Sequence, residues 1–413
     1  MVRFLHTADW QLGLTRRWLR GEAQGRYADA RVAAVRALGV VAGEQGCEFV
    51  VVAGDVLESP QVATGTLRRL FEALKEFPVP VYLLPGNHDP LGAGSVYRTR
   101  LWERECPGHV HVLDRPGPWP VADSVELLAA PWPSKRPGED LVARALADLP
   151  PAEGVRIGVA HGPVDRILPD HADSNHATIN TGTVEQALAS GRLHYLALGD
   201  RHSVTPVGDS GAIWYSGTPE VTDFRERRPG EVLVVDVDPG APEPVRVAGH
   251  QVGRWRFEVV ERELLDGRDV ETLDADLDRR VDKDRAVVRL VLRGVLDLPA
   301  HQRLGEVLER HGQLFAALHT WDRAGDLRLR PDLTAMPGWG LSGFVAGAAA
   351  EIADSSAGAG QLQPPGTTDR ADGAQSSAAL LDWEPSWDGP EDATSARDAL
   401  ALLYRLTVAR EST

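Results

Sequence analysis

Short apolar runs without alternation recur along the first half of the chain. The run Phe49–Ala53 is rich in β-branched residues and has polar sequence on both sides, which is typical of a strand buried on both faces of a sheet. Further runs predict strands at Val2–Thr7, Val79–Leu84, Val125–Ala129, Val155–Ala160 and Leu193–Leu198. Amphipathic stretches between the first three strands predict helices at Tyr27–Glu44 and Val62–Phe77. The strand–helix–strand order predicts an α/β fold with right-handed crossovers.

The later part of the chain predicts a second sheet and then a change of composition. Strands at Ile213–Ser216 and Val232–Val237 are expected to close the second sheet. The proline-rich segment Pro239–Pro244 marks a boundary, and a smaller α+β unit without a cluster of candidate ligands is expected beyond it. Its predicted elements are strands near Arg254–Val260 and Ala286–Leu292 and helices near Val270–Val281 and Leu304–Arg310.

The last part of the chain differs again. It holds an apolar helix at Leu341–Ile352, then a segment rich in Gly, Ser, Pro and Gln that is typical of a disordered linker. A terminal amphipathic helix at Ser395–Arg410 either folds back or docks on a partner. The predicted domains are residues 1–240, 250–331 and 336–413.

Polar residues follow the predicted buried strands where these strands end. Because open α/β sheets place their sites beyond the carboxyl ends of the strands, these side chains are expected at one cleft. They are Asp9, Gln11, Asp55, Asn87, His88, His161, Asp200 and His202. The two-residue spacing of Asp9 and Gln11 would place both side chains on one face of an extended backbone, and Asp200 and His202 repeat that spacing. One such residue is ordinarily a helix cap or turn residue, but the ordered repetition predicts a metal centre.

This set is large enough to bind two divalent ions if Asp55 bridges them. The predicted metal ligands are Asp9, Gln11, Asp55, Asn87, His161, Asp200 and His202. A pair of ions suits phosphoryl transfer, because it activates a water molecule and neutralises the charge that develops on phosphorus. His88 is the candidate donor of the leaving-group proton, so the predicted catalytic residues are His88, Asp55 and Asn87.

Taken together, these motifs resemble the calcineurin-like metallophosphoesterase superfamily over about residues 1–240. They are Asp9-x-Gln11, Gly54-Asp55, Gly86-Asn87-His88-Asp89, His161-Gly162 and Gly199-Asp200-Arg201-His202. The opening His6–Gly13 is similar to that of the SbcD/YhaO group of DNA repair exonucleases. The resemblance implies a two-sheet sandwich flanked by helices, followed by a small α+β capping domain that helps to hold DNA.

The same resemblance assigns the ligands to two ions. One ion would be bound by Asp9, Gln11, Asp55 and His202, and the other by Asp55, Asn87, His161 and Asp200. The superfamily usually has histidine in place of Gln11 and of Asp200. Because an amide is a weaker ligand than imidazole and a carboxylate is a harder one, the centre should favour Mn²⁺, with Mg²⁺ or Fe²⁺ as alternatives, over Zn²⁺. These exchanges either tune an enzyme or mark a site that has changed to a binding role.

Nucleases of this group commonly work with a coiled-coil ATPase of the SMC type. The lysines of this chain, Lys75, Lys135 and Lys283, stand outside any Gly-Lys-Ser/Thr context, so ATP use would require another subunit. The terminal helix Ser395–Arg410 is the predicted docking element for that subunit. A homodimer is also compatible with the sequence.

Charge and cysteine content limit the remaining alternatives. The formal net charge of -16 argues against DNA binding over the whole surface but allows a local basic groove. Candidate arginine clusters are Arg16, Arg17 and Arg20; Arg98, Arg100 and Arg104; and Arg225, Arg227 and Arg228. Cys47 and Cys106 are too few for a disulfide framework. Since no signal peptide or membrane-spanning run is evident, we expect a cytoplasmic protein without a membrane partner.

Three functions follow from these observations. The first is a two-metal phosphodiesterase that cuts DNA as an exonuclease, which the arginine clusters and the appended α+β unit favour. The second is a phosphodiesterase acting on a small nucleotide or phosphoester, which the acidic charge favours. The third is a catalytically degenerate scaffold subunit, suggested by Gln11 and Asp200.

Overall fold

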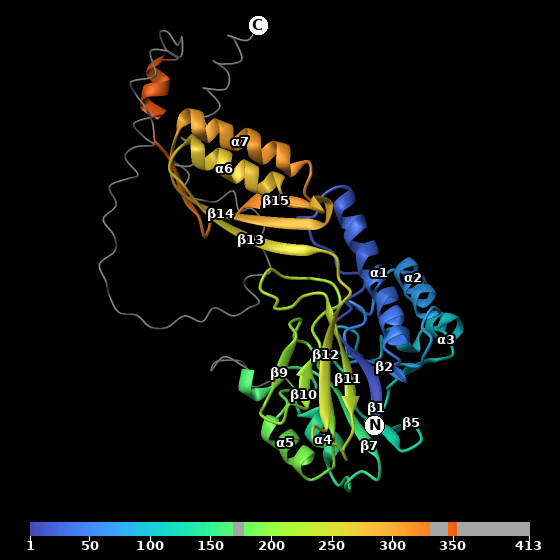
Figure 1. Cartoon of the computed structure of the whole chain (residues 1–413). Helices are drawn as coiled ribbons and strands as arrows, with labels where there is room; N and C mark the ends of the chain where they lie inside the picture. The colour runs from blue at the N-terminus through green and yellow to red at the C-terminus, as the bar shows by residue number, and fades with distance from the viewer. Residues whose placement is uncertain (168–176, 331–345, 353–413) are drawn as a thin grey trace. The chain divides into compact units, whose positions relative to one another are not determined.

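The structure is a computed structural model of the chain and describes residues 1–167, 177–330 and 346–352 (Figure 1). The described chain divides into two compact units, the first at Met1–Phe257 and the second from Glu258 onward. Residues 346–352 are helical, within the helix predicted at Leu341–Ile352. The predicted linker and the terminal helix Ser395–Arg410 lie outside the described residues.

The first sheet of the first unit has six strands in the order β12-β11-β1-β2-β3-β4. Their bounds are β1 Val2–Thr7, β2 Phe49–Val52, β3 Val81–Leu83, β4 Val110–Val112, β11 Glu231–Val237 and β12 Val245–Gln251. Strands β1 to β4 are parallel, and β11 and β12 continue the sheet antiparallel on the other side of β1. The parallel part brings the ends of β1, β2 and β3 to one edge.

The second sheet also has six strands, in the order β5-β6-β7-β8-β10-β9. Their bounds are β5 Gly117–Ala122, β6 Val125–Ala130, β7 Val155–His161, β8 Tyr195–Gly199, β9 Thr205–Val207 and β10 Ile213–Tyr215. The central strands β6, β7 and β8 are parallel to one another. This sheet therefore presents the ends of β7 and β8 together.

The two sheets pack face to face, and helices cover their outer faces (Figure 1). Val51 of β2 packs in the inner core with Leu127 and Val159 of the second sheet, whereas its neighbours Val50 and Val52 pack in the outer core. The covering helices are α1 Glu22–Glu44, α2 Thr64–Leu74 and α3 Arg100–Glu105 on the first sheet, and α4 Leu141–Leu146 and α5 Thr181–Ala189 on the second. The predicted two-sheet α/β sandwich flanked by helices is confirmed, and the burial of β2 on both faces explains its unbroken apolar sequence.

One predicted strand lies in a different sheet from the one expected. Strand β10 joins the second sheet as predicted, but β11 pairs antiparallel with β1 in the first sheet, with Val2 opposite Val237 and His6 opposite Leu233. The prediction that Val232–Val237 closes the second sheet is therefore wrong. The physical reason is that β1 pairs with β2 along one edge only, so its other edge needs a partner for its backbone groups.

The second unit has an α+β fold of its own. Its sheet has the order β13-β14-β15, and β16 also pairs with β14. The bounds are β13 Arg256–Leu264, which begins at the end of the first unit, β14 Ala286–Asp297, β15 Ala317–Thr320, β16 Asp326–Arg330, α6 Gly267–Asp278 and α7 Leu298–Gly312. Helix α6 begins with a capping box formed by Asp266 and Asp269, and α7 is capped by Asp297. Short 3₁₀ helices lie at Val96–Arg98, Asp165–Ile167 and Lys283–Arg285.

The second unit contains a group of acidic and histidine side chains that the sequence analysis did not expect. Asp274, Asp278 and His311 offer ligand atoms within 4.8 Å of one another. However, Asp274 accepts a hydrogen bond from Arg303 at 3.1 Å, lies 2.7 Å from His311 Nε2, and also pairs with Arg310. Because guanidinium groups already compensate this carboxylate, we interpret the group as an ion-pair network that joins α6 to α7.

None of the helices in the described ranges has the length and apolar character that crossing a bilayer requires.

Candidate metal centre

The predicted ligands come together where strands of both sheets end. Asp9 follows β1, Asp55 follows β2, Asn87 follows β3, His161 ends β7 and Asp200 follows β8. Asp9, Asp55 and His161 offer ligand atoms that all lie within 4.8 Å of one another, and all three residues are buried. The chain thus gathers carboxylates from separate strand ends into one small volume.

His161 lies at the middle of this group. Its Nε2 is 2.7 Å from Asn87 Oδ1, 3.4 Å from an Asp55 oxygen and 3.8 Å from an Asp200 oxygen. Its Nδ1 lies 2.9 Å from the carbonyl oxygen of Ala53, which can only accept, so Nδ1 carries a proton and donates it there. This second contact orients the ring and directs Nε2 toward Asn87, Asp55 and Asp200, an arrangement that would suit a metal-binding histidine.

Gln11 and His202 form the other side of the site, with Gln11 Nε2 3.1 Å from His202 Nε2. The Nδ1 atom of His202 lies 2.6 Å from the hydroxyl of Thr222 and 3.3 Å from a carboxylate oxygen of Glu226. Burial lowers the pKa of His202, but the hydrogen bond to Glu226 and the charge of Asp9 outweigh burial and raise it to about 9. Thr222 and Glu226 therefore support His202, and the sequence analysis did not identify either of them.

His88 lies beside the shared carboxylate. Its backbone N–H donates to Asp55 Oδ1 at 2.9 Å, and its ring Nδ1 lies 2.9 Å from the carbonyl oxygen of Glu58. The ring is partly exposed, at 37% for the side chain. Burial lowers its pKa, but the negative charge of Asp55 outweighs burial and the net shift is upward. His88 is therefore held beside Asp55 with part of its ring open to solvent.

Asp89 has a structural role that the sequence analysis did not assign. Its fully buried carboxylate accepts hydrogen bonds from the backbone N–H groups of Gly86 and Leu57, at 2.8 and 3.0 Å, and from the hydroxyl of Tyr97 at 2.7 Å. These contacts join the loop after β3 to the loop after β2. Asp89 thereby fixes the two loops that present Asp55, Asn87 and His88.

Several ligands have an uncommon backbone conformation. Asp9, Gln11, Asp55 and Asp200 have positive φ angles of 55°, 41°, 54° and 98°. The expectation that Asp9 and Gln11 share a face of extended backbone is therefore wrong. Main-chain hydrogen bonds hold this loop instead, from Asp9 N to Gly54 O at 3.0 Å and from Gln11 N to Asp55 O at 2.9 Å. Residues in sparsely populated φ/ψ regions concentrate at functional sites, where surrounding contacts maintain them.

Glycines next to the ligands leave the space that the site needs. A Cβ atom on Gly86 would lie 2.2 Å from Asp55 Oδ1, and one on Gly54 would lie 2.2 Å from His161 Nδ1. One on Gly199 would lie 2.0 Å from the carbonyl oxygen of Ala53. The glycines of the three motifs are thus required by close packing of the loops.

The donor set fits divalent cations. Its oxygen donors are Asp9, Asp55, Asp200 and Asn87, and its nitrogen donors are His161 and His202. Gln11 lies beside them with its amide nitrogen toward His202. Burial raises the pKa of Asp9 to about 7, because a buried carboxylate is costly to ionise unless a positive charge compensates it. A bound cation provides that compensation, so the residues present suit a hard or borderline divalent metal.

Comparison with known proteins agrees with this description. No curated protein matches the chain. Solved structures that match part of the chain include TT1561 of Thermus thermophilus, at 11% identity and a TM-score of 0.37, covering 61% of this chain and 99% of that one. Another is a dimetal phosphatase from Danio rerio, at 15% identity and a TM-score of 0.38, covering 61% of this chain and 96% of that one. Residues 2–236 match the sequence model of the calcineurin-like phosphoesterases, and the chain therefore belongs to that family.

Proposed function

We propose that the chain is a two-metal phosphodiesterase that hydrolyses DNA, acting as a repair exonuclease together with an SMC-like ATPase subunit. Membership of the family indicates a metal-dependent hydrolase of phosphoesters. The observation that carries the proposal is the convergence of the ligand set on His161, with His88 hydrogen-bonded to Asp55 beside it.

The ligands divide between two positions that share Asp55. Asp9, Gln11 and His202 would complete one position, and Asn87, His161 and Asp200 the other. Divalent ions bound there would supply activation of a water molecule and compensation of charge on phosphorus.

The residues of the chain orient the reactants and move one proton. The water gives up one proton to solvent as its oxygen forms a bond to phosphorus. The bond from phosphorus to the leaving oxygen breaks, and the leaving oxygen takes up a proton. His88 Nδ1 is engaged by the carbonyl of Glu58, so Nε2 is the ring nitrogen that donates the proton. The bond from His88 N to Asp55 Oδ1 keeps the histidine at a fixed position relative to the shared ligand.

DNA is the proposed substrate because basic residues lie close to the centre despite the net charge of -16. The segment that contains Thr222 and Glu226, the supports of His202, also contains Arg225 and Arg227, and both arginines are exposed. Arg225 pairs with Asp223 at 3.1 Å, and both arginines would offer guanidinium groups to DNA phosphates near the one being cleaved. The resemblance of His6–Gly13 to DNA repair exonucleases points in the same direction.

A nuclease assay tests the proposal. Labelled duplexes and single strands are incubated with the full chain and Mn²⁺, Mg²⁺ or Fe²⁺, and Asp55→Ala is the control. Shortening of the labelled ends by the wild-type chain alone is expected. Hydrolysis of bis(p-nitrophenyl) phosphate without any loss of DNA would favour the small-substrate alternative that the acidic charge suggests. Absence of both activities in protein that contains two ions per chain would refute the enzymatic function.

A salt series separates the two substrates independently. DNA binding releases counterions and should weaken steeply between low and moderate salt, whereas binding of a compact phosphoester should change much less.

A further inference from the structure

Helix α1 contains an arginine that is buried against the loop after β1. Arg31 is only 2% exposed, in the middle of a helix that covers the first sheet. Arginine is almost never buried to this degree unless its charge is compensated and its N–H groups have acceptors. The acceptors that Arg31 uses therefore indicate what this side chain does.

The Arg31 guanidinium group donates to neutral oxygen atoms in two parts of the chain. On one side, Nε and Nη2 donate to the carbonyl oxygen of Trp10 at 3.1 and 2.5 Å, and Nη2 lies 3.5 Å from that of Asp9. On the other side, Nη1 donates to the hydroxyl of Tyr27 at 3.1 Å and to the carbonyl oxygen of Glu220 at 3.3 Å. We call Asp9–Gln11 the ligand loop. Arg31 thus joins the ligand loop to helix α1 and to the segment at Glu220.

The ligand loop needs support because of its backbone conformation. Asp9 and Gln11 have positive φ angles, which residues other than glycine adopt only where surrounding contacts maintain them. The loop after β2 accepts hydrogen bonds from the N–H groups of both residues. The carbonyl groups of Asp9 and Trp10 receive their side-chain donors from Arg31 and, at Asp9, also from the hydroxyl of Thr218 at 2.9 Å. Main-chain bonds therefore hold one side of the ligand loop, and side-chain donors hold the other.

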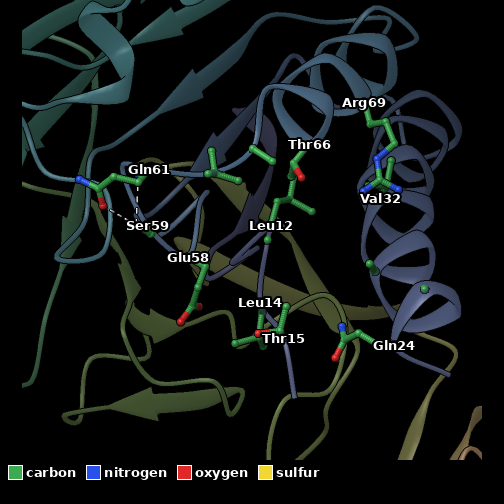
Figure 2. Close-up of a pocket in the computed structure, with 15 residues that line it drawn as sticks. Leu12, Leu14, Thr15, Gln24, Val32, Glu58, Ser59, Gln61, Thr66 and Arg69 are labelled. Carbon is green, nitrogen blue, oxygen red and sulfur yellow. Dashed lines mark hydrogen bonds between the residues drawn. The ribbon is translucent and has the colours of Figure 1, made fainter. Parts of the chain in front are cut away.

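Apolar packing does not fully close the space between this part of the chain and helix α1. A cavity of about 430 Å³ lies there. Figure 2 shows two of its lining residues, Leu12, which follows Gln11 in the chain, and Val32, which follows Arg31. The hydrogen bonds of Arg31 thus provide a connection between α1 and the ligand loop beside a region where close packing is incomplete.

We propose that Arg31 is a positioning residue of the metal centre. It fixes the carbonyl groups of the ligand loop and thereby holds the carboxylate of Asp9 where one of the two ions requires it. This inference rests on the two-ion centre of the proposed function. Arginine suits the task because its planar group has five donors in a fixed geometry, so it can bond to Trp10 with two nitrogens and to Tyr27 with the third.

Metal affinity tests the proposal without reference to activity. Arg31→Met keeps most of the length of the side chain but removes its charge and its donors. Titration calorimetry with Mn²⁺ on the metal-free full chain should show two ions bound to the wild type. In the variant one of them should bind about tenfold more weakly or worse, the effect typical of a group that orients a metal ligand. Unchanged affinity for both ions would overturn the proposal.

Arg156 provides a matched control. It is also buried, at 5%, and it donates to the carbonyl oxygens of Pro150 and Arg192 at 2.8 Å. It lies near the start of β7, however, whereas the ligand His161 ends that strand. Arg156→Met should lower the free energy of unfolding but bind both ions with wild-type affinity. Equal weakening of Mn²⁺ binding in the two variants would indicate a general loss of stability and would refute the positioning role.

Arg31→Lys separates charge from geometry and replaces Arg31→Met if that variant does not fold. Lysine keeps the positive charge, but its single nitrogen cannot reproduce the two bonds to Trp10 together with those to Tyr27 and Glu220. One ion should therefore again bind more weakly than in the wild type. Wild-type affinity for both ions in Arg31→Lys would mean that only the charge matters and would overturn the proposal.

The outcome can be separated from that of the proposed function. A wild-type chain that binds fewer than two ions would reject the two-ion centre itself. Two ions in the wild type, with unchanged affinities in the Arg31 variants, would reject the role of Arg31 and keep the centre.

Discussion

His88 and Asp55 are joined by one hydrogen bond, but their proposed roles at the centre differ. Asp55 is buried in contact with His161, whereas His88 is partly exposed and touches the centre through its backbone N–H. In the proposed mechanism, removing the His88 side chain would remove the proton donor without removing a metal ligand.

We predict that His88→Ala lowers kcat on DNA by about 100-fold or more, the usual contribution of a general acid, while metal content stays near that of the wild type. The loss should be much smaller for bis(p-nitrophenyl) phosphate, because p-nitrophenolate leaves without protonation. Steady-state kinetics on both substrates, with elemental analysis of the same preparations, check this. Loss of metal in the variant would mean that His88 is a ligand.

A second prediction concerns Glu226, which lies behind His202. Glu226→Gln should weaken Mn²⁺ binding by about 10-fold or more, the effect typical of partners that orient a metal-binding histidine. Titration calorimetry with Mn²⁺ measures the affinity of the wild type and of the variant. Glu103→Gln, an exposed substitution on α3, is the matched control and should bind Mn²⁺ as the wild type does.

The roles of some residues could not be predicted from the sequence, and the physical reason is the same for each of them. Asp55 and His161 could be predicted because each stands at the end of an apolar strand. Glu226 stands in an irregular segment 24 residues after His202, and only the folded chain shows that the two meet. Asp89 could be read as part of a motif, but its role depends on donors from Leu57 and Tyr97 that no local pattern reveals.

At the scale of elements, β1 is joined to both sheets. It pairs with β2 and β11 in the first sheet, and its His6 is completely buried against β8 of the second. His6 Nε2 donates to the carbonyl oxygen of Leu198 at 3.2 Å, and Nδ1 accepts from the hydroxyl of Tyr195 at 3.0 Å. Both bonds suit a neutral ring, and burial lowers the pKa of His6 to about 3.

This buried ring should make stability depend on pH. Because its pKa is lowered by folding, the contribution of His6 is present above the unfolded value of about 6.5 and is lost as the pH falls toward the folded value. Each pH unit below about 6.5 should cost about 1.4 kcal/mol of the free energy of unfolding through this group. Urea titrations of the wild type and of His6→Phe at several pH values check this prediction. The variant should be less stable near neutral pH, but its free energy of unfolding should fall less steeply as the pH is lowered below about 6.5. Parallel slopes would contradict the prediction.

The strands also show which features of the fold a hydrophobic pattern can predict. The bounds of β1 agree with those expected, because an apolar run between polar residues defines a strand directly. The prediction that β11 belongs to the second sheet was wrong, because β11 pairs with β1 and this pairing joins residues as far apart in the chain as Val2 and Val237. Strands β5 and β12, which contain no fully buried residue, were not predicted, because they lack an apolar run.

At the scale of the whole molecule, metal binding at the proposed centre should raise the stability of the fold. Asp9 and Asp55 are almost completely buried, and Asp200 lies close to His161 with them. A cation that binds the folded chain but not the unfolded one stabilises it by mass action, by about 2.7 kcal/mol at 100 times the Kd.

Chelation should therefore lower the melting temperature. For a domain of this size the expected drop between Mn²⁺ and EDTA is about 5 to 10 °C. Differential scanning calorimetry measures it, and Asp55→Ala should show little change between the two conditions. A wild-type melting temperature unaffected by EDTA, in protein shown to have lost its metal, would count against a buried metal centre.

The main chain, rather than the ligand side chains, sets the course of the loops after β1 and β2. Their backbone bonds continue past the strands, from Asp9 N to Gly54 O and on to Leu12 N and Val56 O. A substitution at Gln11 can therefore change the side chain without moving the backbone from which it departs. The left-handed conformation limits this exchange, since it admits asparagine, aspartate and histidine more readily than β-branched residues.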